Sequence, residues 1–230
     1  LGRQLPSSIP RDRVTTTLVS SLFAQFQPHR GRSPVPHATL FQTAIAHQFH
    51  GANVLYSNFI NSDVAVFQQA QQQGLRTVHE LIISPEIPYI LDDERRAFPG
   101  LEPTEPMNQI QAGTDRDHQK WAVSDRILVP SPYVQQALER FGVERDRIHL
   151  VPYGLSEAWL NQPGFPQRGR ILFVGSVRLL KGCHYLAEAA RLLKRRGVDC
   201  EVRVVGSVPP NLRQHPAFEG PVYVGAVPRS

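Results

Sequence analysis

Apolar, β-branched runs alternate with helix-forming segments along most of the chain, and this alternation most constrains what the chain can fold into. Strand-like runs stand at 53–59, 75–80, 125–130, 147–154, 170–175, 201–206 and 221–227. Helix-like segments stand between them at 61–74, 105–122, 131–142 and 182–197. Strands that alternate with helices form parallel sheets covered by those helices. The sequence therefore predicts an α/β protein whose ligands bind at the carboxyl ends of its strands.

Local signals mark the ends of these helices. Ser131 is a good N-cap for the helix at 131–142, Pro132 suits its first turn, and Gly142 suits its end. The proline-rich stretch 81–104 predicts a loop with one short helix at 90–97. On the helix at 182–197, the 3.6-residue spacing predicts a buried face made of Tyr185, Leu186, Ala189, Ala190, Leu192 and Leu193.

A stretch rich in proline and glycine divides the chain into two parts. We expect residues 156–169 to be an interdomain linker between a partial domain at 1–155 and a second partial domain at 170–230. The segments 15–27 and 36–50 look helical, but nothing in the sequence places them against the sheets.

Composition narrows the class of protein. Hydrophobic residues make up 41% of the chain and charged residues 20%, which is typical of a soluble globular protein. No apolar run approaches the ~20 residues of a membrane span, and the amino terminus lacks a signal peptide's apolar region. Two cysteines cannot form a disulfide framework, so we expect reduced thiols and a cytoplasmic protein. Nothing indicates membrane association, which stays open.

Positive charge gathers in the second part of the chain. Residues 1–155 carry 14 Lys and Arg against 15 Asp and Glu, whereas residues 156–230 carry 11 against 5. A basic domain suits an anionic ligand. Nucleic acid is not expected as a partner, because the basic residues lack the aromatic residues that single-strand binders interleave with them.

The sharpest functional signal lies at 171–189. An apolar strand ends at Gly175, a short loop carries Arg178 and Lys181, and Gly182 opens a helix. A cation early in a helix is unfavourable unless an anion binds there, and a helix N-terminus offers free N–H donors for such an anion. The pattern is neither a P-loop nor a G-x-G-x-x-G dinucleotide fingerprint. A solvated loop lysine is the alternative explanation of Lys181.

Two stretches together resemble one protein family. ILFVGSVRLLKG followed by HYLAEAARLL and EVRVVGS resembles the donor domain of glycosyltransferase family 4, which has the GT-B fold. DRILVPSPYVQQALERFGVERDRIHLVPYGL resembles the end of the acceptor domain and the hinge. The resemblance covers 125–230. It implies two Rossmann-like domains and transfer of a sugar from a nucleotide sugar to an acceptor hydroxyl, with retention and without a metal or other cofactor. The acceptor would be a glycan, a lipid or a small molecule.

The resemblance also assigns donor-binding residues. Lys181 matches the family's phosphate-binding lysine, and Arg178 is the nearest substitute for an arginine whose usual place, after Gly175, is held here by Ser176. At the ends of later strands, Gly206 and Gly225 would lie near the nucleotide. The chain has Tyr153 where the family's Pro-Asn-Gly turn has asparagine.

Two family features are missing, namely a glycine-rich loop after a first strand and the paired glutamates E-x7-E. We therefore expect a piece of a longer protein that is catalytically incomplete. Two alternatives remain open: a degenerate, non-catalytic binder of nucleotide sugars, and a nucleotide-sugar 2-epimerase on the same scaffold.

The first domain offers catalytic candidates at the end of the run 75–80. His79 and Glu80 would face the cleft of a parallel sheet, where a histidine can accept the acceptor's proton or hold the sugar. A structural strand-end histidine is the alternative. Ile83 replaces the second histidine of an H-E-x-x-H motif, and His47 and His50 have no third ligand nearby, so no metal is expected. Cys183 is expected to pack rather than react.

Overall fold

The computed structural model describes residues 45, 48–57, 64–155, 157–161 and 163–227. The helix expected at 15–27 lies outside these residues, as does most of the one expected at 36–50. The chain packs as two compact units that do not follow chain order. Of the described residues, the first contains 45, 48–57, 64–81, 116–128 and 146–149, and the second contains 82–115, 129–145, 150–155, 157–161 and 163–227. The linker and the domain boundaries expected from the sequence stay predictions.

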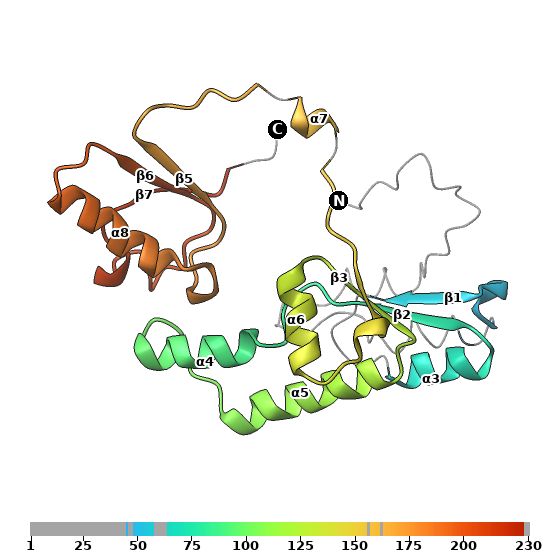
Figure 1. Cartoon of the computed structure of the whole chain (residues 1–230). Helices are drawn as coiled ribbons and strands as arrows, with labels where there is room; N and C mark the ends of the chain where they lie inside the picture. Colours follow the sequence, from blue (N-terminus) through green and yellow to red (C-terminus); the bar gives the residue numbers. More distant parts are fainter. Residues whose placement is uncertain (1–44, 46–47, 58–63, 156, 162, 228–230) are drawn as a thin grey trace, which may run out of the picture. The chain divides into compact units, whose positions relative to one another are not determined.

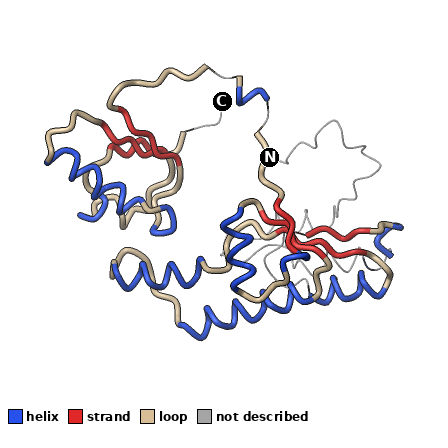
Figure 2. Tube along the Cα trace, in the orientation of Figure 1, coloured by secondary structure: helices blue, strands red, loops and turns tan. Residues whose placement is uncertain are grey.

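Four strands in the first part of the described chain form one sheet (Figures 1 and 2). Its order is β1 (Val54–Ser57), β2 (Arg76–Glu80), β3 (Arg126–Val129) and β4 (Ile148–Leu150). Strand β1 pairs with β2, and β2 with β3, in parallel. The helices between these strands are α3 (Val64–Gln72), α4 (Ile87–Ala97), α5 (Met107–Ala122) and α6 (Pro132–Arg140). The predicted alternation of strands and helices is confirmed.

The sequence signals at the helix ends act as expected in α6. The Ser131 side chain accepts a hydrogen bond from the backbone N–H of Val134 at 3.4 Å, and Pro132 occupies the first turn. After the helix, Gly142 takes the left-handed conformation at φ 83°. This cap geometry satisfies one free N–H donor and needs no Cβ at the turn.

A second, three-stranded sheet carries the charged loop singled out above. Strands β5 (Arg170–Val174), β6 (Glu201–Val205) and β7 (Val222–Gly225) are all parallel. Helix α8 (Cys183–Arg195) connects β5 to β6 and lies beside the sheet (Figure 1). Between β6 and β7 stands only the short 3-10 helix η5 (Pro216–Phe218). In the second sheet, the connection from β5 to β6 thus contains a full helix, whereas the connection from β6 to β7 contains only the short η5.

The buried face of α8 differs from the sequence expectation. Its buried residues are Cys183, His184, Ala187 and Ala190, whereas Tyr185 is 53% exposed and Leu192 38% exposed. The reason is close packing at the start of β7. A Cβ built on Gly220 would lie 3.3 Å from the carbonyl oxygen of Ala187. Only small side chains fit between a helix and a backbone that approach this closely.

An apolar cluster holds the second unit together. It contains Val177, Leu179 and Cys183 with Val204 of β6, all at most 3% exposed. Leu101, from the segment after α4, is 2% exposed in the same cluster. The packing of Cys183 expected from the sequence is confirmed.

The remaining elements are short: the 3-10 helices η2 (Gln48–Gly51), η3 (Arg145–Arg147) and η4 (Leu179–Lys181), and the helix α7 (Glu157–Leu160). Helix α7 falls inside the stretch expected to be a linker. Within the described residues, no helix combines the length and the apolar character that crossing a bilayer requires.

At the carboxyl ends of β5 and β6, the backbones of Gly175 and Gly206 lie in direct contact, with no side chain between them. A Cβ on Gly206 would lie 2.0 Å from the carbonyl oxygen of Gly175, and Gly206 has φ 148°. No side chain other than hydrogen fits that space.

We therefore expect Gly206→Ala to destabilise the protein by about 3 kcal/mol, because the new methyl group collides with backbone that cannot move aside. Denaturant unfolding followed by circular dichroism measures this. Gly154→Ala is the matched control, since nothing lies within 4 Å of its Cβ position. Equal stability of the two variants would contradict the contact.

Candidate functional site

Three glycines form a row at the carboxyl edge of the second sheet. Gly175 follows β5, Gly206 follows β6, and Gly225 ends β7. The backbone N–H of Gly175 donates to the carbonyl of Val205, and that of Gly206 donates to the carbonyl of Gly225, both at 2.9 Å. The edge therefore presents backbone without side chains, and at Gly225, where nothing lies within 4 Å of the Cβ position, a ligand can approach closely.

Two cations follow the first glycine of this row. Arg178 precedes η4, Lys181 ends it, and Gly182 turns the chain into α8 with φ 67°. Both side chains are exposed. Neither makes a hydrogen bond or ion pair with another described residue, so both charges are available to an anion.

The start of α8 lies directly after these cations. Gly182 is its N-cap and offers no side chain to accept the first N–H groups. The half-buried Ser176 lies upstream, and its carbonyl accepts a weak hydrogen bond from the Cys183 thiol at 3.9 Å. Burial raises the pKa of that thiol, which makes it a poor nucleophile. The edge, with its glycines, cations and uncapped helix, suits anion binding rather than covalent chemistry.

His79 lies inside the first unit. Its side chain is 4% exposed and contacts the ring of Phe67 edge-on, with 6.5 Å between centroids. Desolvation by burial and, to a smaller extent, the nearby charge of Lys120 together lower the pKa of His79 to about 4, against smaller opposing effects of Asp117, Glu80 and a hydrogen bond to the Ser57 backbone. This burial favours the structural role of His79 over contact with an acceptor. Its catalytic role stays a prediction.

Glu80 is the last residue of β2 and is half-buried. The Tyr56 hydroxyl, from the neighbouring strand β1, donates a hydrogen bond to its carboxylate. The structure thus gives Glu80 a tyrosine partner that the sequence pattern did not indicate. Its role in catalysis also stays a prediction.

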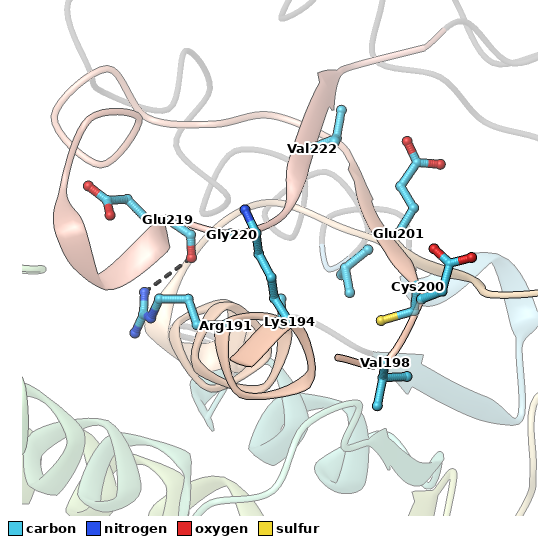
Figure 3. Close-up of a pocket in the computed structure, with 11 residues that line it drawn as sticks. Arg191, Lys194, Val198, Cys200, Glu201, Glu219, Gly220 and Val222 are labelled. Carbon is cyan, nitrogen blue, oxygen red and sulfur yellow. Dashed lines mark hydrogen bonds between the residues drawn. The ribbon is translucent and has the colours of Figure 1, made fainter. Parts of the chain in front are cut away.

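A pocket of about 530 Å³ opens at the opposite, amino-terminal end of the second sheet (Figure 3). Val198, Val202 and Val222 contribute its apolar wall. The Arg191 guanidinium donates to the carbonyls of Pro216 and Glu219, at 2.9 and 3.1 Å. None of Gly175, Arg178 or Lys181 lines it.

A metal site was not expected from the sequence. Among the described residues, no group of three or more His, Cys, Asp or Glu side chains comes together in a way that could hold an ion. The site residues assigned from the sequence thus divide between the two units: Gly175, Ser176, Arg178, Lys181, Gly206 and Gly225 share one edge, whereas His79 and Glu80 belong to the other sheet.

Comparison with known proteins bears on the fold. No family model matches the chain, and no curated protein matches it. Among solved structures, HepE of Anabaena in complex with UDP and glucose is 13% identical, with a TM-score of 0.52 over 83% of this chain and 51% of that one. This likeness shows a shared fold, and the predicted α/β architecture of GT-B type is confirmed.

Two further structures match with lower TM-scores. The lipopolysaccharide outer core galactosyltransferase WaaB, in its apo form, is 10% identical with a TM-score of 0.49, over 85% of this chain and 51% of that one. UGT2 of Phytolacca americana, complexed with UDP-2-fluoro-glucose and pterostilbene, is 15% identical with a TM-score of 0.42, over 83% and 51%. The chain spans about half the length of each of these structures.

The buried histidine predicts a pH dependence of stability. Folded His79 has a pKa of about 4, below the ordinary value of 6.5. As pH falls, His79 therefore binds a proton in the unfolded chain before it does so in the folded protein, and this favours unfolding. The stabilisation from neutral His79 is complete above pH 6.5, and about 3 kcal/mol of it is lost between pH 6.5 and 4. His79→Gln should flatten this slope in denaturant unfolding, and the same change at exposed His149 should leave it intact. An unchanged slope in His79→Gln would refute the assignment.

Proposed function

We propose that the carboxyl edge of the β5–β6–β7 sheet binds the diphosphate of a nucleotide sugar, and that the protein transfers the sugar to an acceptor hydroxyl. The observation that carries this proposal is the row Gly175, Gly206 and Gly225 beside two unpaired, exposed cations. A diphosphate needs close backbone approach and compensation of its negative charge. The glycines provide the first, and Arg178 and Lys181 provide the second.

The position of the cations supports a phosphate ligand over a solvated loop. Lys181 lies two residues before Cys183, the first residue of α8, where the positive end of the helix dipole disfavours it in the absence of an anion. A bound diphosphate would turn this repulsion into a joint attraction by the ammonium, the guanidinium and the free N–H groups. This is the charge balance that a departing nucleoside diphosphate requires.

Retention at the anomeric carbon and independence from metal are part of the proposal. The resemblance to glycosyltransferase family 4 supports both, and it supports a reaction in which basic side chains, rather than a cation, neutralise the leaving group. HepE, which shares the fold, was solved with UDP and glucose. We infer that the donor here is likewise a nucleoside diphosphate sugar.

The acceptor is proposed for the complete protein rather than for this chain alone. Because the chain spans about half the length of the structures it matches, transfer itself requires testing on the complete polypeptide. A glycan, a lipid or a small molecule fits the proposal. Release of free sugar epimer without any acceptor product would instead identify a 2-epimerase, and product analysis separates the two reactions.

Titration with nucleoside diphosphates tests the site. We expect the wild-type chain to bind UDP, GDP or ADP in calorimetry, and Lys181→Ala to weaken binding by about 2 kcal/mol, or roughly thirtyfold, because a charge-assisted phosphate contact is lost. Lys194→Ala is the matched control, because Lys194 lines the pocket at the opposite end of the sheet. Saturable binding by none of the three nucleotides, or identical affinities in the two variants, would rule the proposal out.

A further inference from the structure

The turn that carries Lys181 is held by a segment that lies about 80 residues earlier in the sequence. Residues 86–102 and the whole stretch 175–195 belong to the same compact unit. Leu101 is buried in the cluster that contains Val177 and Leu179. This packing holds the segment around Leu101 next to η4, the turn that ends in Lys181.

Glu102 caps this turn. Its carboxylate Oε1 accepts a hydrogen bond from the backbone N–H of Leu179, the first residue of η4, at 2.9 Å. Arg178 occupies the N-cap position of η4, yet its side chain makes no capping bond. The cap thus comes from outside the turn, where local sequence signals do not report it.

Arg95 holds the capping carboxylate from the other side. Its guanidinium lies 3.9 Å from Glu102 and 3.7 Å from Glu105. The side chains of Arg95 and Glu102 are 15% and 19% exposed, so this pair is largely shielded from solvent. Glu105 is 45% exposed and makes the same kind of ion pair, but no hydrogen bond ties it to η4.

A second carboxylate of the same segment holds the first turn of α8. Glu94 lies 3.0 Å from Nε2 of His184 and accepts the Tyr185 hydroxyl at 2.9 Å. The ring of Phe98 packs on both aromatic rings, with centroids 4.4 and 5.5 Å away. Glu102 therefore holds the backbone before Lys181, and Glu94 holds two side chains that follow Gly182.

We propose that Glu102 is a positioning residue for the donor-phosphate turn, with Glu94 as a second anchor. This inference rests on the proposed function. Gly182 turns the chain between η4 and α8 in the left-handed conformation, and without the cap the three residues of η4 lose their external hydrogen bond. Lys181 would then sample many positions, and the affinity for a diphosphate would fall.

The charge of Glu102 by itself predicts the opposite effect. A carboxylate near a bound diphosphate repels it, so a purely electrostatic role makes every variant that removes the charge bind more tightly. The positioning role depends instead on whether the side chain at position 102 is long enough to bond the Leu179 N–H. Glu102→Asp keeps the charge but withdraws the carboxylate by about 1.5 Å, the length of one carbon–carbon bond. Glu102→Gln removes the charge but keeps an oxygen at the same distance.

Calorimetric titration of the intact chain with UDP separates the two roles. We expect Glu102→Asp to weaken UDP binding about fivefold, the usual worth of a helix cap, and Glu102→Gln to bind at least as well as wild type. Glu105→Asp is the control and should bind like wild type. Hydrogen–deuterium exchange at Leu179 to Gly182 should accelerate in Glu102→Asp and stay slow in Glu102→Gln.

The outcomes are distinguishable. UDP binding by Glu102→Asp equal to wild type overturns the positioning role and leaves the proposed function intact. Unchanged exchange at Leu179 in Glu102→Asp overturns the cap. A wild-type chain that binds none of UDP, GDP and ADP overturns the proposed function and the positioning role with it. Because both variants keep a polar group of similar size, failure to fold is not expected in either.

Discussion

The close approach of two strand ends is the constraint on which the rest of the second unit depends. Because Gly206 presents no Cβ, the backbone of Gly175 passes against it, and the chain can leave β5 toward η4 while β6 continues alongside. Any larger residue would push these strand ends apart. The hydrogen bonds from Gly175 to Val205 and from Gly206 to Gly225 then fix all three ends in one row, and that row places the cations of the following turn at the carboxyl edge.

Charge is used differently at the two ends of this sheet. At the amino end, Arg191 and Arg195 pair with Glu188, and Arg170 and Arg203 pair with Glu201. The pairs of Glu188 lie within α8, and those of Glu201 link Arg170 of β5 with Arg203 of β6. At the carboxyl edge, Arg178 and Lys181 have no such partner among the described residues. The arginines at the amino end thus share carboxylate partners, two to each glutamate, whereas the two cations of the carboxyl edge have none among the described residues.

Much of the fold could be predicted because its signals are local. A helix cap such as Ser131 acts within four residues, and strand or helix periodicity acts within one element. The burial of α8 could not be predicted in this way. Hydrophobicity favoured Tyr185 and Leu192, which are exposed, whereas the close contact with Gly220 selected Ala187 beside the expected Ala190. Likewise, the strand-end position of His79 was predicted, but only the structure shows that its side chain is buried against Phe67.

The sequence by itself determined the parallel α/β architecture, the glycines at the strand ends and the cations of the turn after β5, since each follows from the order and spacing of neighbouring residues. Only the tertiary structure decided which side chains support that turn. Glu102 and Glu94 lie 77 and 90 residues from their partners Leu179 and His184. No periodicity or capping rule reaches over such separations, because these contacts exist only once apolar burial around Leu101 has brought the two segments together.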